Sequence, residues 1–300
     1  MKNKPIYVET SISSDMEKVW EASQNPELHE QWDLRFSSIT YLPKKENEPQ
    51  LFEYKTNIGF GFSIAGWGKS VGTFHAKDNS RTSSLHFGTD QKISPIKEGK
   101  GYWKYEPEQE GIKFFTQYDY EVRFGALGKM IDRVLFRPMM GWATALSFDV
   151  FKRWLEKGDI PSNQYVRFFS HWLITILFFF VWVYHGLVPK LLLMHPEEVS
   201  MTQGMLPLTV NEAQNIVSTA GVIEIVFGLL WILYSNKRRL LKIQVVVFPL
   251  LTLSTLIGDA TVFGDPFNPL TFNLTLFVLS VIGLLVSKDI PTAKSCKRSR

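Results

Sequence analysis

Only one cysteine, Cys296, is present among the 300 residues, so the chain cannot form an internal disulfide. The same scarcity excludes a CxxC redox motif and a metal site built from several thiolates. The sequence also lacks the G-x-G-x-x-G pattern and the P-loop that cradle nucleotide phosphates. No motif therefore predicts a metal or a bound cofactor. The net charge of +4 does not indicate a nucleic-acid partner, since the basic residues lie mainly beside apolar runs.

Long apolar runs are almost absent from the first 160 residues, whereas four of them crowd the rest of the chain: residues 168–187, 216–234, 240–257 and 272–286. Each run approaches the ~20 residues that a helix needs to cross a bilayer. A soluble domain requires amphipathic helices with polar outer faces, which four successive runs of this kind cannot supply. We therefore predict an all-α four-helix transmembrane bundle over residues 165–290.

The charges beside these runs predict how the chain crosses the membrane. The N-terminus, MKNKPIYVET, lacks the apolar core of a signal peptide, so we expect the first 160 residues to stay on the side where they are made. Cations gather before the first run, between the second and third, and after the fourth: Lys152, Arg153, Lys157, Arg167, Lys237, Arg238, Arg239, Lys242, Lys288, Lys294, Lys297, Arg298 and Arg300. The other two loops hold one cation, Lys190. The positive-inside rule then places both termini in the cytoplasm of a multi-pass protein of the bacterial inner membrane.

Residues 1–160 have the pattern of a mixed α and β domain. Alternation over residues 6–12 predicts a strand, Ser14-Asp-Met-Glu17 has the form of a capping box, and a short helix is expected over 26–32. Strand-like segments rich in aromatic and β-branched residues follow, over residues 36–42, 51–57, 62–74, 82–87, 101–107 and 113–124. A long helical pattern over 126–155 completes the domain, and Pro138 should bend it or lie at a junction.

This order of elements indicates an antiparallel sheet curled around its last helix, with a cavity between them. The segments IYVETSISSDMEKVWEASQNPELHEQWD and LGKMIDRVLFRPMMGWATALSFDVFKRWLE lie at the start and at the end of this half. On these segments the half resembles the SRPBCC superfamily of START-like and polyketide cyclase-like domains. The resemblance implies a helix-grip fold that binds hydrophobic small molecules, with a minority of members catalysing reactions.

Aromatic residues of this half are candidates for the wall of the cavity, with a filled core as the alternative: Trp20, Trp32, Phe62, Trp67, Phe87, Trp103, Phe115 and Trp142. The titratable candidates for catalysis are His29, Asp33, Arg35, His75, His86, Asp119, Glu121 and Arg123. No pair among them has a spacing that dictates a catalytic arrangement. Asp119 and Glu121 are more typical of a solvated strand face, and we therefore favour binding over catalysis.

The C-terminal half combines three motifs: HGLVPK at 185–190, GVIEIVFG at 221–228 and PFNPLTFN at 266–273. On these motifs it resembles the DoxX-like family of small bacterial four-span membrane proteins. The distant relative DoxX is a subunit of a thiosulfate:quinone oxidoreductase. The resemblance therefore suggests quinone as a cofactor, but only by analogy of fold.

One carboxylate, Glu224, lies within the second apolar run, where it costs about 2.5–3.5 kcal/mol on insertion scales unless it has a partner. The predicted topology brings five polar residues to the outer half of the bundle: His185, Lys190, Glu224, Asp259 and Asn273. Two interpretations stay open. Glu224 can join helices through a hydrogen bond, with Gly221 and Gly228 allowing close packing, or it can belong to a ligand or proton site.

The sequence as a whole predicts an α+β helix-grip domain over residues 1–160, a DoxX-like bundle over 165–290, and a basic cytoplasmic tail over 291–300. The first functional hypothesis is the binding of a lipid, isoprenoid or quinone without chemistry, with membrane lipids as further partners. The second is a subunit of a quinone-linked membrane oxidoreductase that uses the outer polar cluster. The third is a structural partner of another membrane protein.

Overall fold

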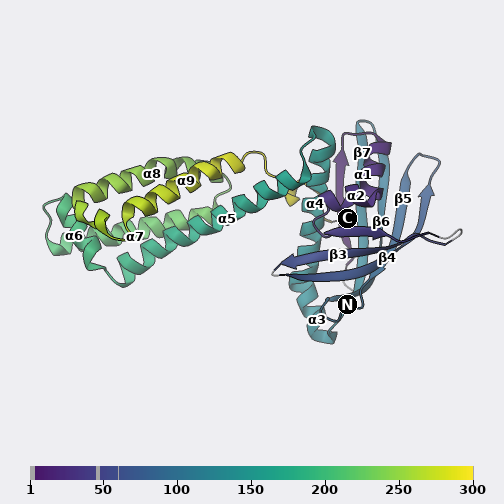
Figure 1. Ribbon diagram of the computed structural model, residues 1–300, viewed down its shortest axis with the longest axis horizontal. Coiled ribbons are helices and arrows are strands. Elements are labelled where there is room, and N and C mark those ends of the chain that lie inside the picture. The colour runs from purple at the N-terminus through teal and green to yellow at the C-terminus, as the bar shows by residue number, and fades with distance from the viewer. Residues whose placement is uncertain (1–3, 45–47, 60, 300) are drawn as a thin grey trace. The chain divides into compact units, whose positions relative to one another are not determined.

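The computed structural model describes residues 4–44, 48–59 and 61–299. They form two compact units (Figure 1). The first contains the chain up to Tyr165 together with Pro291–Arg300, and the second contains Val166–Ile290. The second unit is thus inserted into the sequence of the first.

The elements of the first unit follow the expected order. They are β1 (Ile6–Ile12), α1 (Met16–Gln24), α2 (Pro26–Trp32), β2 (Ser38–Tyr41), β3 (Leu51–Gly59), β4 (Phe62–His75), β5 (Arg81–Gly88), β6 (Ile96–Glu108), β7 (Gly111–Val122), α3 (Gly125–Ile131), the π-helical turn η1 (Asp132–Phe136) and α4 (Arg137–Lys157). The bounds of β1 and α2 match the predicted ranges. The N-cap of α1 is Asp15 rather than Ser14, because the Asp15 carboxylate accepts the hydrogen bond from the Lys18 backbone N–H.

An antiparallel sheet with the strand order β1-β7-β6-β5-β4-β3-β2 forms the body of this unit among the described residues. Because side chains alternate along a strand, β7 directs Phe114, Thr116 and Tyr118 to one face and Phe115 to the other. The first face packs against α4, where Phe114 stacks on Phe148 at a centroid distance of 4.6 Å. The fold class predicted for this half, a sheet closed by a long helix, is confirmed.

The long C-terminal helix of the unit is interrupted near its start. The predicted pattern over 126–155 divides into α3, η1 and α4, and Pro138 lies in the first turn of α4, where its missing N–H is tolerated. Pro138 therefore lies at a junction, which is one of the two alternatives predicted for it from the sequence. Gly158 ends α4 in the left-handed conformation, with φ +71°.

The segment after residue 290, predicted as a basic tail, packs against the first unit. Glu9 and Lys297 exchange two backbone hydrogen bonds of 2.9 Å, so this segment adds a bridge to β1. Cys296 is buried, and its thiol donates to the Ala145 carbonyl over 3.3 Å. Asp149 accepts hydrogen bonds from the Thr292 N–H at 2.8 Å and from the Ser295 hydroxyl at 2.6 Å. The polar composition of residues 291–300 concealed these contacts.

The second unit consists of helices. They are α5 (Pro161–His185, beginning in the first unit), the π-helical η2 (Gly186–Leu192), α6 (Pro196–Met205), α7 (Val210–Leu233), α8 (Lys237–Gly258), the 3-10 turn η3 (Ala260–Gly264) and α9 (Pro269–Val286). Four of the helical stretches in the described chain are long and apolar enough to cross a membrane, namely α5 with η2, α7, α8 and α9. Only 22–28% of their apolar windows is buried inside the protein, so their outer faces are apolar too. This is the pattern of helices surrounded by lipid.

Aromatic side chains fill the centre of this bundle. Phe178 lies 5.0 Å from Trp231 and 6.2 Å from Phe248, measured between ring centroids. Helices also meet at glycines, because a Cβ added to Gly186 would lie 2.4 Å from the Gly221 carbonyl oxygen. The close packing expected at Gly221 is confirmed by this approach. The extra helix α6, between the first two spans, was not predicted.

Candidate functional site

A cavity of about 660 Å³ lies within the first unit. Its wall comes from strands β2 to β7, from the end of α1, from α2 and the turn after it, and from η1 and the first turns of α4. Phe136, Met139, Met140 and Ala143 follow helical spacing and form the helical side of the wall. The volume falls within the ~300–1,000 Å³ of small-molecule sites.

Three of the eight predicted aromatic residues, Phe87, Trp103 and Trp142, line this cavity. The other five do not, and each has another place in the fold. The Trp20 ring lies 5.0 Å from Tyr105, and Trp32 stacks on Phe151 at 4.2 Å. Phe62 is 61% exposed, and Trp67 packs edge-on against His86. Phe115 faces Tyr7 on the outer side of the sheet. Composition identified the aromatic residues, but the face of each strand or helix on which they lie decides which of them reach the cavity.

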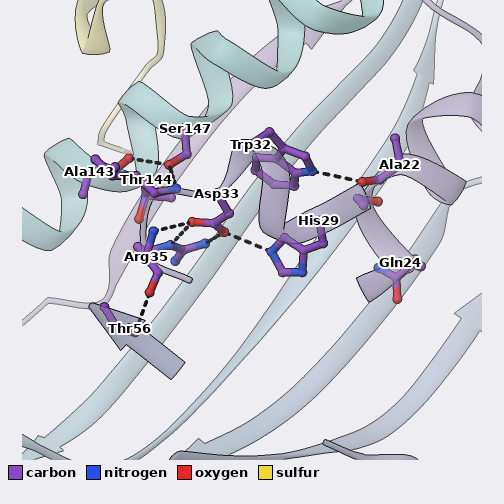
Figure 2. Close-up of polar contacts among 12 residues, drawn as sticks. Ala22, Gln24, His29, Trp32, Asp33, Arg35, Thr56, Ala143, Thr144 and Ser147 are labelled. Carbon is purple, nitrogen blue, oxygen red and sulfur yellow. Dashed lines mark hydrogen bonds and ion pairs between the residues drawn. The ribbon is translucent and has the colours of Figure 1, made fainter. Parts of the chain in front are cut away.

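A polar group stands at the cavity where α2 ends. The Arg35 guanidinium donates two hydrogen bonds to Asp33, from Nε to Oδ1 over 2.8 Å and from Nη2 to Oδ2 over 2.6 Å. His29 Nε2 lies 3.1 Å from Asp33 Oδ2 (Figure 2). The Asp33 side chain has no exposed surface, whereas His29 and Arg35 line the cavity. The group thus presents one histidine and one arginine to the cavity, with a carboxylate behind them.

Electrostatics fix the charges of this group. Burial raises the pKa of Asp33, but the charge and hydrogen bonds of Arg35 and the bond to His29 outweigh it, so the pKa lies well below its usual range. Burial lowers the pKa of His29 despite the opposing effect of Asp33. At neutral pH the group therefore holds an ionised Asp33, a charged Arg35 and a neutral His29.

His29, Asp33 and Arg35 were each predicted as titratable candidates, but not as one group. The signal was available, since positions 29 and 33 are four residues apart and meet on one face of a helix. The other titratable candidates serve as separate surface or structural contacts. Asp119 pairs with Arg137 at 2.8 Å, Glu121 lies 3.5 Å from Lys97, His86 lies 3.3 Å from Glu98, His75 lies against Trp20, and Arg123 donates to the Thr89 carbonyl.

An exposed apolar surface borders the helical side of the cavity. Its large side chains are 46–74% exposed, and we call them the α3–η1 surface: Phe124, Leu127, Met130, Ile131, Val134, Leu135 and Met139. The exposed charges within residues 124–135 are the cations Lys129 and Arg133. Asp132 in the same segment is buried, accepting a hydrogen bond from the Tyr120 hydroxyl at 2.7 Å. Met139 belongs both to this surface and to the cavity wall.

The second unit contains a separate charged cluster around Lys190 of η2. Its Nζ donates a hydrogen bond to Glu198 Oε1 of α6 over 3.2 Å. It lies equally close, 3.2 Å, to Glu224 Oε2 of α7, as an ion pair outside hydrogen-bond geometry. Glu198 was not among the predicted cluster residues, because α6 was not foreseen.

The remaining predicted members of this cluster form no hydrogen bond or ion pair with Lys190 among the described residues. The His185 ring is 5.1 Å from the Phe272 ring, and Asn273 is buried in α9. Asp259 caps η3, accepting from the Thr261 N–H at 2.9 Å and from its hydroxyl. Asp259 therefore stabilises a turn. Its position directly after an apolar run did not indicate this role. In the described residues, no group of three or more His, Cys, Asp or Glu side chains could hold a metal ion.

These features define a membrane protein with four apolar spans and an α+β domain that encloses a cavity. A family model described as the DoxX-like family matches residues 179–281, and the chain belongs to that family. The uncharacterized membrane protein YndG of Bacillus subtilis (strain 168) is 47% identical over 188 residues, which are 62% of this chain and 70% of that protein. The DoxX-like resemblance found in the sequence is confirmed.

Two solved structures have a weak similarity to about half of this chain. A STAR-related lipid transfer protein from Xanthomonas axonopodis is 14% identical, with a TM-score of 0.36, over 45% of this chain and 78% of that one. The Zhui aromatase/cyclase from Streptomyces sp. R1128 is 9% identical, with a TM-score of 0.38, over 52% of this chain and 98% of that one.

Proposed function

We propose that this chain is a membrane-anchored binding protein for an apolar small molecule such as a lipid, an isoprenoid or a quinone. The observation that carries the proposal is the cavity of about 660 Å³, whose wall is largely apolar and aromatic. A wall that is largely apolar is typical of sites that take hydrophobic ligands, and its polar residues, among them His29, Arg35 and Lys44, can orient such a ligand. The binding domain corresponds to residues 1–160 and the anchor to residues 165–290.

The α3–η1 surface supports an exchange of the ligand with a lipid surface. Contiguous exposed apolar side chains of this kind mark interaction sites in soluble domains. The two exposed cations of the segment, Lys129 and Arg133, suit anionic headgroups. Since Met139 also lines the cavity, a molecule leaving the lipid surface would meet the cavity wall directly.

We place both termini in the cytoplasm of a bacterial cell, with the spans in its inner membrane. The excess of Lys and Arg around the first and last spans supports this orientation. The inclusion of Pro291–Arg300 in the first unit supports a common side for both ends. Reporter fusions after Arg300 and within residues 196–214 should respond from opposite sides, and a common side would refute the four-span arrangement.

Binding can be tested on the full chain purified from membranes. Ala143 lines the cavity, so Ala143→Phe should fill part of it, whereas Ala126→Phe places the same ring at an exposed position of α3. Mass spectrometry of the co-purified apolar molecules should identify a molecule that the wild type retains. The control variant Ala126→Phe should retain the same molecule. That molecule should be lost from Ala143→Phe. Equal retention by both variants would contradict binding in this cavity.

The cluster at Lys190 favours a second candidate, a subunit of a quinone-linked membrane oxidoreductase. Ionisable residues within a transmembrane bundle are costly and often mark functional sites. Lys190 is held by carboxylates on two other helices, Glu198 and Glu224. Quinone reduction that is lost in Glu224→Gln, with the melting temperature unchanged, would support this candidate over simple binding.

A further inference from the structure

The polar group of His29, Asp33 and Arg35 restricts the head group of the ligand more narrowly than the apolar wall does. His29 and Arg35 both line the cavity, among Leu34, Phe36 and Trp103. The His29 ring is packed edge-on against Phe36 at 5.2 Å and against Trp103 at 4.7 Å. A histidine fixed in this way offers its polar atoms in one defined direction.

The group carries no net charge toward a ligand. Arg35 uses Nε and Nη2 on the two oxygens of Asp33, so its positive charge is matched by the carboxylate it holds. The guanidinium is further packed over the Tyr118 and Phe36 rings, at 5.5 and 5.6 Å. An anionic head group would therefore meet an arginine that is already neutralised and a carboxylate close behind it.

The hydrogen bond to Asp33 decides the tautomer of His29. An ionised carboxylate can only accept, so the His29 Nε2 that lies 3.1 Å from Asp33 Oδ2 must carry the proton. The ring is neutral, and its other nitrogen, Nδ1, is then an acceptor. No hydrogen bond to Nδ1 is formed by the described residues. Nδ1 can thus accept a hydrogen bond from a ligand in the cavity that His29 lines.

We propose that the cavity selects an uncharged amphiphile with a hydroxyl head group, and that this hydroxyl donates its hydrogen bond to His29 Nδ1. The inference rests on the proposed binding function and narrows its ligand class. It favours long-chain, isoprenoid or phenolic alcohols over fatty acids and phosphorylated lipids. A carboxylate or a phosphodiester has no proton to donate at neutral pH, and a phosphate monoester has lost most of its own, so their oxygens would face the Nδ1 lone pair.

The test uses the full chain in nanodiscs and three photoreactive long-chain probes that differ only in the head group: a primary alcohol, its methyl ether and a carboxylate. Peptide mass spectrometry measures crosslinking at the cavity residues Met140 and Trp142, relative to crosslinking on α9. This ratio corrects for the different partitioning of the probes into lipid. We expect the alcohol to exceed the ether by about fivefold, the effect of one buried hydrogen bond, and to exceed the carboxylate as well.

Two variants separate the hydrogen bond from the packing. In His29→Leu the acceptor is gone, so the alcohol and the ether should crosslink equally, while the ether yield stays near that of the wild type. In His29→Gln the amide N–H₂ can donate to Asp33 and its carbonyl can accept, so the preference for the alcohol should persist. Equal alcohol and ether yields in the wild type, a preferred carboxylate, or an undiminished preference in His29→Leu would overturn the inference alone. Absence of cavity crosslinks with all three probes would overturn the proposed function with it.

Discussion

Lys190 of η2 and Glu224 of α7 form an ion pair, with Nζ 3.2 Å from Oε2. Both side chains are largely buried, at 12% and 14% exposure, so each charge depends on its partner for solvation. Glu198 of α6 shares the same cation, which means that three helical segments are joined through one lysine. The position of Lys190 follows from η2, since a π-helical turn advances side chains differently from an α-helix.

The first prediction ranks variants of this cluster by how much stability each of them loses. Lys190→Met leaves Glu198 and Glu224 without their cation and should destabilise by about 3 kcal/mol. Glu224→Leu should cost less, about 1–2 kcal/mol, because Lys190 keeps Glu198. Glu224→Gln should cost least. Melting temperatures in detergent measure the order, with the exposed Lys242→Met as control. A Lys190→Met protein as stable as this control would contradict a structural cluster.

The second prediction concerns the approach of η2 to α7. A Cβ at Gly186 would lie 2.4 Å from the Gly221 oxygen, and one at Gly221 would lie 2.8 Å from the Gly186 oxygen. Both neighbours are backbone atoms, so Gly186→Ala must separate the segments and should cost about 1–3 kcal/mol. Gly264→Ala is the matched control, since a Cβ there meets nothing within 4 Å. Similar melting temperatures for the two variants would show that the segments do not pack this closely.

Local chemistry explains why much of the fold was predictable. The bounds of α2 follow from the Asn25 cap and Pro26 at its first turn, both visible in the sequence. The spans followed from their composition, and the pairing partner of Glu224 was among the residues considered. By contrast, α6 has little apolar periodicity and is placed by contacts with α7 and α8, which no local pattern reveals.

The candidate site was harder to predict, because it depends on how the sheet curls. Phe114 and Phe115 are neighbours in β7, yet Phe114 packs on α4 and Phe115 faces the other side. An aromatic residue in a strand can therefore lie on either face of the sheet, and composition does not show which face. Trp32 was excluded from the cavity by stacking on Phe151, a contact between residues far apart in sequence.

The third prediction concerns acid. Burial lowers the pKa of His29 below its ordinary value near 6.5, while Asp33 opposes and Arg35 assists. Between the ordinary and the folded pKa the unfolded chain binds a proton that the folded chain does not. His29 thus contributes fully above about pH 6.5, and stability falls below it by at most about 1.4 kcal/mol per pH unit. His29→Gln should lose less stability than the wild type between about pH 7.5 and about pH 5.5 in thermal melts. An identical loss would show that His29 protonates freely in the folded protein.

The fourth prediction uses Cys296, the single thiol of the chain. Burial raises the pKa of this thiol, and the surrounding segment is held by Asp149 through Thr292 and Ser295. Labelling with a thiol reagent should therefore be slow. Asp149→Ala removes both bonds and should accelerate labelling at least about tenfold, given ~1.5–3 kcal/mol for hydrogen bonds to a charged group.

Glu9→Ala is the control for Cys296, because it keeps the two backbone hydrogen bonds between Glu9 and Lys297. It removes only the exposed side-chain ion pair of 3.8 Å between them, and such surface pairs contribute about 0–1 kcal/mol. Its labelling rate should stay close to that of the wild type. Rapid labelling of the unmodified chain would instead mean that residues 291–300 are free in solution.

The last prediction concerns Gln244, which is fully buried in α8. Neither its amide nitrogen nor its amide oxygen has a hydrogen-bond partner among the described residues. Each buried polar atom left unpaired costs about 1–3 kcal/mol, whereas an apolar side chain of similar size has no such cost. Gln244→Leu should therefore raise the melting temperature in detergent, and Gln244→Glu should lower it, because a carboxylate is harder to bury than an amide. A lower melting temperature for Gln244→Leu would contradict the cost assigned to the unpaired amide.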